Sequence, residues 1–460
     1  FAIDQVTIQA GMEIDVMISA EADVEKAIQE YYGVAASIQA AVKSLGVADL
    51  KREQARATVT GPTAKGALET ADAPVARLVE MIIKQALDDN ASDIHIEPAE
   101  TGLRIRYRID GVLFEATNPP KSIESALISR IKVMGNMDIA ETRAPQDGGF
   151  SMKFGNKEIE IRASCCPTIW GENVVLRILD RSKLLLKLDD LGLLGEGRDK
   201  FQSMLTNPYG VILVTGPTGS GKTTTLYAAL SQLNKPDRNI KTIEDPVEYR
   251  LDGIRQTQVN PKANITFSTG LRSLMRQDPD IMMVGEIRDD ETAEIAIQAA
   301  LTGHLVFSTV HTNDAAGAVT RLQDMGVESF LLSSALLGVL AQRLVRIICT
   351  ECKESYELDD ATKKQIGIRQ DLSVKAYKGT GCKHCNSTGY KGRLGIYELL
   401  IIDDPVRQLI LSKSSAQAIR AQGRKQGMKV LREDGLRKVI RGLTTVEEIM
   451  RVTQADHIES

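Results

Sequence analysis

The chain has 460 residues, with 57 basic and 61 acidic side chains, a formal net charge of −4 and only 4% aromatic residues. A chain of this length is too long to fold around a single hydrophobic core, so the length predicts about three domains. The nearly balanced charge argues against a dedicated nucleic-acid binder, and the few aromatic side chains argue against base-stacking platforms. We find no secretory signal and no apolar run that could cross a bilayer, so we expect a cytoplasmic protein without direct membrane insertion.

The N-terminal part predicts an incomplete domain followed by a linker. Apolar and polar residues alternate at first and then take helical spacing, which indicates the tail of a small α/β domain over residues 1–50. Because the chain begins at Phe1, without Met and inside this predicted domain, we expect it to be truncated. Residues 51–73 are polar and contain a Gly-Pro pair and a further glycine, a composition typical of a flexible linker.

Residues 74–180 predict a mixed α/β domain. A helix with apolar spacing begins at Pro74 and leads to the segment Ser92-Asp93-Ile94-His95-Ile96. In the predicted strand that follows, residues 103–111, apolar side chains alternate with three arginines, which places the two kinds on opposite faces. We expect a short linker at residues 181–190.

Residues 191–460 begin with alternating predicted strands and helices, which favours an α/β domain with a largely parallel, doubly wound sheet. One predicted strand, residues 211–215, leads into a complete GxxxxGK[ST] phosphate loop and then a helix. In such a loop the backbone N–H groups and the helix N-terminus bind phosphate, Lys222 reaches the β- and γ-phosphates, and the Thr223 hydroxyl ligates Mg²⁺. The predicted nucleotide-binding residues here are Gly216, Pro217, Thr218, Gly219, Ser220, Gly221, Lys222, Thr223 and Thr224. The alternative, a fortuitous glycine-rich turn, leaves the flanking strand and helix unexplained.

Two later predicted strands end in acidic residues. The carboxyl ends of parallel strands meet at one ligand-binding edge, so we expect these acids near the phosphates. We predict that Glu244 and Asp245 position water around Mg²⁺, unless they only cap a turn. Glu286 ends the predicted strand at residues 281–286, and Gly285 stands where such strands usually carry a metal-binding Asp. We therefore predict that Glu286 is the general base for the attacking water, or orients that water.

His304 and His311 bracket a third predicted strand, residues 305–310. Either imidazole could sense the γ-phosphate by hydrogen bonding, and a purely structural role is equally open for each. We place both in the predicted site, His304 as a nucleotide-binding residue and His311 as a catalytic one.

Residues 330–348 are the most apolar region of the chain, interrupted by Gln342, Arg343 and Arg346. We interpret this region as a buried helix that ends in a charged surface. The last sixty residues have mostly helical spacing and few strand signals.

Four of the six cysteines form two CxxC pairs with 29 residues between them. In a cytosolic protein, paired CxxC sequences indicate tetrahedral zinc far more often than disulfides. We predict a structural zinc site whose ligands are Cys349, Cys352, Cys382 and Cys385. The alternatives are four reduced cysteines without metal, thiol–disulfide exchange, or competition by His384 for the metal. Cys165 and Cys166 are adjacent, and we interpret both as buried strand residues.

Six sequence boxes together resemble the secretion-ATPase superfamily, the motors of type II secretion and type IV pilus assembly. They are GPTGSGKT at 216–223, TIEDPVEY at 242–249, IMMVGEIRD at 281–289, TGHLVFSTVHTNDA at 302–315, SDIHIEP at 92–98 and RIDG at 108–111. The resemblance covers nearly the whole chain. It implies a PAS-like domain at residues 74–180 and a RecA-like ATPase domain at residues 191–460. The latter would include a zinc subdomain at about 345–395 and a helical part at 400–460.

The resemblance also implies the catalytic machinery and the partners. Glu286 would be catalytic together with Lys222 and His311, and arginines of both domains would surround the phosphates: Arg272, Arg276, Arg162 and Arg177. Each of these arginines also has an ordinary interpretation as a surface or ion-pair residue. The implied cofactors are ATP, Mg²⁺ and Zn²⁺, and the implied partners are five further copies in a homo-hexamer and an inner-membrane platform protein, with the motor associated peripherally with that membrane.

Within the superfamily, tetracysteine zinc marks pilus-assembly and type II secretion motors and is missing from retraction motors. Between those two systems we favour pilus assembly, with type II secretion as the alternative. A DNA-translocating ring ATPase and a nucleotide-binding scaffold without turnover are hypotheses from other classes. A scaffold without turnover would be expected to lack the phosphate-loop lysine or the catalytic base. In this chain Lys222, Thr223 and Glu286 are all present.

Overall fold

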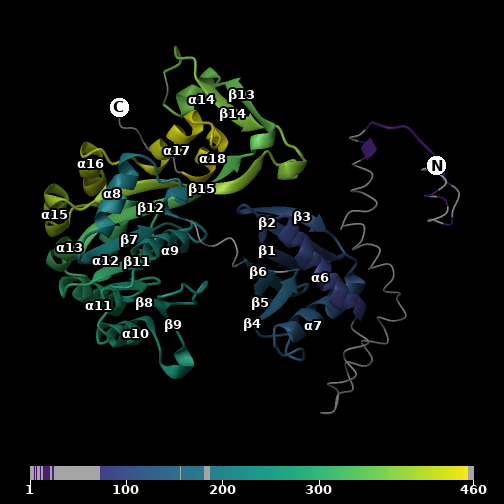
Figure 1. The fold of residues 1–460 in the computed structure, drawn as a ribbon, viewed down its shortest axis with the longest axis horizontal. Helices are drawn as coiled ribbons and strands as arrows, with labels where there is room; N and C mark the ends of the chain where they lie inside the picture. Colours follow the sequence, from purple (N-terminus) through teal and green to yellow (C-terminus); the bar gives the residue numbers. More distant parts are fainter. Residues whose placement is uncertain are drawn as a thin grey trace. The chain divides into compact units, whose positions relative to one another are not determined.

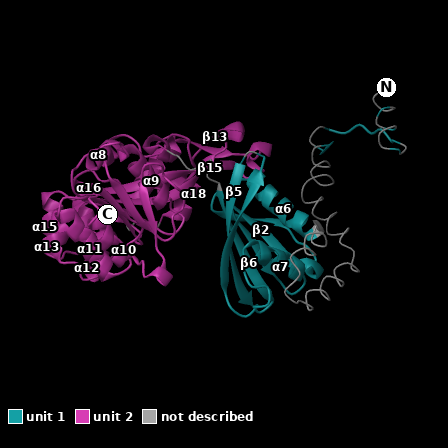
Figure 2. Ribbon diagram, turned by 60° about the horizontal axis from the view of Figure 1, so that its bottom comes forward, with its two compact units in different colours: residues 1–180 teal, residues 181–460 magenta. Residues whose placement is uncertain are grey.

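The computed structural model describes residues 73–453 apart from 156, 181–186 and 368, together with residues 5, 7, 11, 14–20, 23 and 24. The chain divides into two compact units, residues 1–180 and 181–460 (Figures 1 and 2). Most of the predicted tail domain at 1–50, and all of the predicted linker at 51–73 except Ala73, lie outside the described residues. Among the described residues, no helix is both long and apolar enough to span a membrane.

From residue 73 on, the first unit as the structure describes it is an antiparallel sheet of six strands in the order β3-β2-β1-β6-β5-β4, with two main helices. Its strands are β1 (Ala91–Pro98), β2 (Leu103–Ile109), β3 (Val112–Thr117), β4 (Gln146–Phe154), β5 (Lys157–Thr168) and β6 (Gly171–Asp180). The helices described between residues 73 and 180 are α6 (Ala73–Asp88), the short η2 (Lys121–Ile123) and α7 (Glu124–Met134). The predicted helix from Pro74 and the predicted strand at 103–111 are thereby confirmed, while the PAS-like fold stays a prediction.

Alternation along β2 explains how this sheet is covered. Leu103, Ile105 and Tyr107 are buried in one apolar cluster with residues of α6 and α7, and the arginines between them point to the other face. The Tyr107 hydroxyl donates a 2.9 Å hydrogen bond to the carbonyl oxygen of Ile82 in α6. One face of the sheet is therefore core, and the other face is charged.

The second unit contains a seven-stranded sheet in the order β15-β12-β7-β11-β10-β8-β9. The strands are β7 (Gly210–Thr215), β8 (Ile240–Glu244), β9 (Arg255–Gln258), β10 (Ile281–Val284), β11 (Leu305–Val310), β12 (Leu336–Ile348) and β15 (Tyr390–Ile401). All neighbouring pairs are parallel except β12 with β15. This confirms the predicted, largely parallel α/β sheet.

Helices cover both faces of this sheet. The described helices of the second unit are η4 (Leu188–Leu191), α8 (Glu196–Leu205), α9 (Lys222–Leu233), η5 (Pro261–Ala263), α10 (Phe267–Met275), α11 (Asp290–Leu301), α12 (Ala315–Asp324), α13 (Ser329–Ala335), α14 (Asp360–Gln365), α15 (Asp404–Leu411), α16 (Ala416–Lys425), α17 (Leu431–Ile440) and α18 (Val446–Val452). The last four confirm the predicted helical C-terminus. Between β12 and β15 lie η6 (Thr350–Cys352), β13 (Lys353–Glu357), β14 (Lys375–Gly379) and η7 (Lys383–Cys385), with β13 and β14 paired antiparallel.

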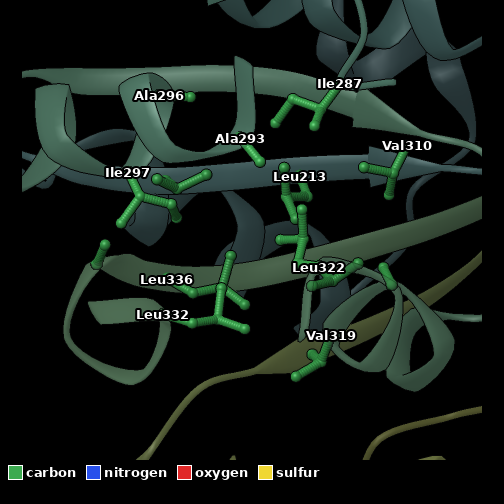
Figure 3. Close-up of a cluster of buried hydrophobic side chains, with 14 of the residues drawn as sticks. Leu213, Ile287, Ala293, Ala296, Ile297, Val310, Val319, Leu322, Leu332 and Leu336 are labelled. Carbon is green, nitrogen blue, oxygen red and sulfur yellow. The ribbon is translucent and has the colours of Figure 1, made fainter. Parts of the chain in front are cut away.

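Strand β7 shows how the two cores are divided. Val211 and Leu213 pack into one apolar cluster with α11, α12 and α13, part of which Figure 3 shows. Ile212 and Val214 point the other way, into a cluster with α8 and α9. A strand buried on both faces reads as a continuous apolar run, which is the pattern of this segment.

The predicted buried helix over residues 330–348 is wrong. The chain forms the short helix α13 and then the thirteen-residue strand β12, which lies between β7 and β15. A strand covered on both faces has no period-2 alternation, so periodicity cannot separate it from a buried helix.

The interpretation of the adjacent cysteines in β5 is half wrong. Cys165 is buried, but Cys166 is exposed, because successive side chains of a strand point to opposite faces.

Candidate nucleotide site and metal centre

The phosphate loop follows β7 at the carboxyl edge of the sheet. Gly216, Gly219 and Gly221 adopt φ angles of 147°, 76° and 86°, which favour glycine. Helix α9 begins at Lys222, so its N-terminus lies directly behind the loop. This strand–loop–helix geometry suits an anion, because loop N–H groups and the positive end of the helix dipole lie together.

Lys222 folds back over this loop. Its Nζ donates hydrogen bonds to the carbonyl oxygens of Gly216 (2.9 Å) and Pro217 (3.2 Å). Burial lowers the pKa of Lys222, and the negative charge of Glu286 opposes that shift. The ammonium group is thus held where phosphate oxygens could replace the two carbonyls.

Glu286 is fixed at the same edge by its neighbours in the chain. The N–H of Gly285 donates to the Ile243 carbonyl (2.8 Å) and the N–H of Ile287 to the Thr309 carbonyl (2.9 Å). These bonds tie the end of β10 to the strands on both sides. The Glu286 side chain is only 15% exposed.

Two hydrogen-bond donors approach the Glu286 carboxylate. The imidazole Nε2 of His311 lies 3.0 Å from Glu286 Oε2, and because a carboxylate only accepts, Nε2 carries the proton in this contact. The Arg288 guanidinium forms an ion pair with the other oxygen. The structure therefore brings three predicted groups together: the loop with Lys222, Glu286 and His311.

The segment after β11 is tied to the phosphate loop through one residue. Thr215, the last residue of β7, accepts a hydrogen bond from the Thr312 N–H (3.0 Å), and the two hydroxyl oxygens lie 2.7 Å apart. The next residue, Asn313, is held by β12, because the Arg343 guanidinium of that strand donates a 2.9 Å hydrogen bond to the Asn313 side-chain oxygen. The position of His311 is thereby coupled to that of the loop.

His304 does not join this site. The parallel register pairs Leu305 with Gly210 and Val310 with Thr215, so His304 lies at the amino end of β11, opposite the loop. Its Nδ1 is 2.8 Å from the Ala299 carbonyl oxygen. Placing His304 among the nucleotide-binding residues was therefore wrong, because six strand residues separate the two histidines.

The two acids at the carboxyl end of β8 have different surroundings. Glu244 is 3% exposed and accepts hydrogen bonds from Thr242 (2.5 Å), Gln256 (3.1 Å) and the Tyr227 hydroxyl. Burial raises the pKa of Glu244, and these three hydrogen bonds oppose the rise. Asp245 is exposed at the edge of the sheet. Glu244 is thus anchored inside a polar network, and Asp245 is the better placed of the two for water around a metal ion.

The four cysteines of the CxxC pairs form one cluster. Their sulfur atoms all lie within 4.8 Å of one another, with distances of 3.7 Å for Cys349–Cys382, 3.8 Å for Cys352–Cys385 and 3.7 Å for Cys382–Cys385. Zn–S bonds of about 2.3 Å in a tetrahedron require sulfur atoms about 3.8 Å apart. Backbone N–H groups of Gly381 and Gly389 also point at sulfur, at 3.3 and 3.2 Å. The donor set and spacing fit Zn²⁺. His384 is exposed, and it is not part of the cluster.

Comparison with known proteins agrees with this architecture. Residues 68–451 match the family described as "Type II/IV secretion system protein". The chain belongs to this family. It is 52% identical over 383 residues to the "Type II secretion system ATPase E" of Vibrio cholerae serotype O1, an alignment that covers 83% of this chain and 76% of that protein.

Two further relatives widen the comparison. The chain is 45% identical over 443 residues to the "Type IV pilus assembly ATPase PilB" of Thermus thermophilus, covering 96% of this chain and 49% of that protein. Among solved structures it resembles the pilus retraction motor PilT with bound ADP, with a TM-score of 0.54, 27% identity, and coverage of 81% of this chain and 96% of that one. The α/β ATPase fold of this secretion family is therefore shown.

The four predicted arginines of this family member lie in both units. In the second unit, Arg272 of α10 is exposed and pairs with Glu291 at 2.6 Å, and Arg276 is exposed at the end of the same helix. In the first unit, Arg162 and Arg177 lie opposite each other on β5 and β6. Arg177 Nε donates to Asp93 Oδ1 at 3.1 Å. Their role around the phosphates stays a prediction.

Sequence reasoning missed a buried acid next to the site, Glu398 of β15. Glu398 is 1% exposed, and its Oε1 accepts a 2.9 Å hydrogen bond from the N–H of Ala315, the first residue of α12. The N–H of Leu431, which begins α17, also bonds to this carboxylate. Burial raises the pKa of Glu398 to about 7; nearby Asp314 adds to the rise, and Arg420 and the two N–H groups oppose it.

This shift predicts a pH-dependent stability. Because the folded pKa lies above the ordinary value of 4.5, the folded protein holds an extra proton between about pH 4.5 and pH 7. The stabilisation of the folded protein by this bound proton is complete at low pH and is lost as the pH rises through 7. Between pH 5.5 and pH 8 we expect wild type to lose about 2 kcal/mol of unfolding free energy relative to Glu398→Gln. Urea unfolding of both proteins at the two pH values measures this, and parallel pH profiles would contradict it.

Proposed function

We propose that this chain is a Mg²⁺-dependent ATPase that powers type II secretion. The observation that carries the proposal is the complete phosphate loop with Lys222 at the same sheet edge as the Glu286–His311 pair. The membership of the secretion family and the named ATPase relatives support it.

The chemistry follows from the positions of these groups. The loop N–H groups and Lys222 bind the phosphates of ATP, and Glu286 accepts a proton from the attacking water, or orients it. The water oxygen forms a bond to the γ-phosphorus while the bond to the β–γ bridging oxygen breaks, which yields ADP and phosphate. The Thr223 hydroxyl and water near Asp245 would hold Mg²⁺, which neutralises phosphate charge. Arg272, Arg276, Arg162 and Arg177 are proposed to stabilise the charge that develops on the phosphoryl oxygens.

The zinc site has a structural role in this proposal. Four thiolates fill the tetrahedron and leave no open position for water or substrate. We propose that Zn²⁺ joins the turn after β12 to the turn before β15, since Cys349 and Cys385 follow and precede these strands.

The relatives favour type II secretion over the pilus-assembly function that we preferred from the sequence. Besides the Vibrio protein, relatives at 50–53% identity carry type II secretion names. One observation keeps pilus assembly as the second candidate: the alignment with PilB covers 96% of this chain, against 83% for the Vibrio protein.

Deleting the gene in the source bacterium separates the two functions. We expect hydrolytic enzymes to disappear from the culture supernatant while surface pili are unchanged, with both measured in the same strain. Loss of pili with normal enzyme secretion would transfer the proposal to pilus assembly. Complementation by the wild-type gene, but not by a Lys222→Ala gene, would tie the phenotype to the phosphate loop.

The assembly and the surroundings are part of the proposal. We infer a cytoplasmic homo-hexamer that reaches the inner membrane through a platform protein and does not act on nucleic acid. ATP hydrolysis by the purified chain should therefore be the same with and without double-stranded DNA. Stimulation by DNA would favour a DNA-translocating ring ATPase instead.

A further inference from the structure

Strand β12 places one buried polar residue beside the phosphate loop. Strands β12 and β7 (Figure 1) pair in parallel. In their register Ala341 lies opposite Thr215, the residue that precedes the loop. Gln342, the next residue along β12, is 1% exposed. A primary amide is rarely buried in a sheet core unless hydrogen bonds satisfy it.

Both ends of the Gln342 amide are bonded to the loop or to its helix. Nε2 donates a 2.7 Å hydrogen bond to the Ser220 carbonyl oxygen. Oε1 accepts a 2.8 Å hydrogen bond from the hydroxyl of Thr225, which lies in the first turn of α9. A Cβ atom added at Gly221 would lie 3.1 Å from Nε2, so the amide also packs closely against a loop glycine.

The bond to Ser220 has a consequence for phosphate binding. In a trans peptide the C=O and the following N–H point in opposite directions. Holding the Ser220 carbonyl toward β12 therefore turns the Gly221 N–H away from β12. A phosphate loop works only when successive N–H groups face the anion, because a carbonyl turned inward would repel it.

We propose that Gln342 is a positioning residue that holds the phosphate loop in its nucleotide-binding conformation. It acts through Ser220 and Thr225 and does not touch the nucleotide. This inference rests on the proposed ATPase function.

The test is nucleotide affinity in variants that break this amide's bonds. Gln342→Met keeps the length of the side chain but can neither donate to Ser220 nor accept from Thr225. We expect its dissociation constant for a fluorescent ADP analogue to rise about 10- to 100-fold, because two buried polar groups lose their partner. In steady state, KM for ATP should rise while kcat at saturating ATP changes little.

Matched variants separate positioning from general destabilisation. Gln323 is also partly buried in this unit and donates to the Ile410 carbonyl (2.9 Å) and to Ser329 (3.0 Å), away from the loop. Gln323→Met should leave the dissociation constant within about twofold of wild type, as expected for a distant site. Thr225→Val should weaken binding, Thr225→Ser should restore it, and the effects of Thr225→Val and Gln342→Met should not add.

The outcomes are distinguishable. If wild type binds the ADP analogue and folded Gln342→Met binds it equally well, the inference is overturned and the ATPase proposal stands. If Gln342→Met does not fold, equal affinity in Thr225→Val and wild type overturns the inference. If wild type itself does not bind ADP, the proposed function fails.

Discussion

Replacing Glu286 by Gln is expected to lower the steady-state rate of ATP hydrolysis by about 10³-fold. The amide keeps the shape of the side chain and can still accept one hydrogen bond from His311 or Arg288, which both approach it. It cannot accept the proton of the attacking water, so chemistry and not binding is lost. The affinity for the fluorescent ADP analogue should stay within a few-fold of wild type.

A matched acid in the same unit supplies the control for this prediction. Glu328 is exposed before α13 and makes no side-chain hydrogen bond to the helix that it precedes. Glu328→Gln should hydrolyse ATP within about twofold of wild type, as surface changes usually do. If Glu286→Gln stays active, the base lies elsewhere at this edge, and Asp245 would be the next residue to replace.

Removing zinc is expected to loosen the segment between β12 and β15. Purified protein should contain one zinc ion per chain, and Cys382→Ser should lose it. Because structural zinc supplies folding free energy directly, we expect loss of the ion to lower the melting temperature by roughly 5–10 °C. The lysines between the two cysteine pairs, such as Lys364 and Lys378, should become sites of rapid tryptic cleavage.

Cys166 provides the control for the zinc experiment. It is exposed on β5 of the first unit, outside the cysteine cluster, so Cys166→Ser should keep both the zinc content and the melting temperature of wild type. If chelation removes the metal and leaves thermal stability and the cleavage pattern unchanged, zinc has no structural role here.

The parts of the site that could be predicted from the sequence are those that local motifs encode. The phosphate loop and the two cysteine pairs each depend on residues a few positions apart, and the chemistry of phosphate and zinc constrains that spacing. Glu286 was found because parallel strands bring their carboxyl ends to one edge. The same rule, applied to strand length, would have excluded His304, since seven residue steps along the strand separate it from His311 by roughly 23 Å.

The contacts missed by sequence reasoning join distant positions. Thr225 and Gln342 are 117 residues apart, and Ala315 and Glu398 are 83 residues apart. Only the order of strands in the sheet brings these residues together. That order could not be predicted from the sequence, because we interpreted the segment that forms β12 as a helix. Once β12 is recognised as a strand beside β7, a buried Gln in it becomes a candidate partner of the loop.

The β12–β15 ladder extends well beyond the rest of the sheet. β12 has thirteen residues and β15 twelve, whereas β10 has four and β8 five. Antiparallel pairing continues from Gly338 to Ile348, and Cys349 follows at once. Gln342 lies on this two-stranded ladder and Cys349 directly follows it, about 23 Å away at the rise of a strand, with one register irregularity between Arg346 and Ile348. A tilt of this ladder by about five degrees at the nucleotide end would displace the end at the cysteine cluster by about 2 Å over that length. A small rotation of the ladder at the phosphate loop would therefore become a larger displacement of the four cysteines.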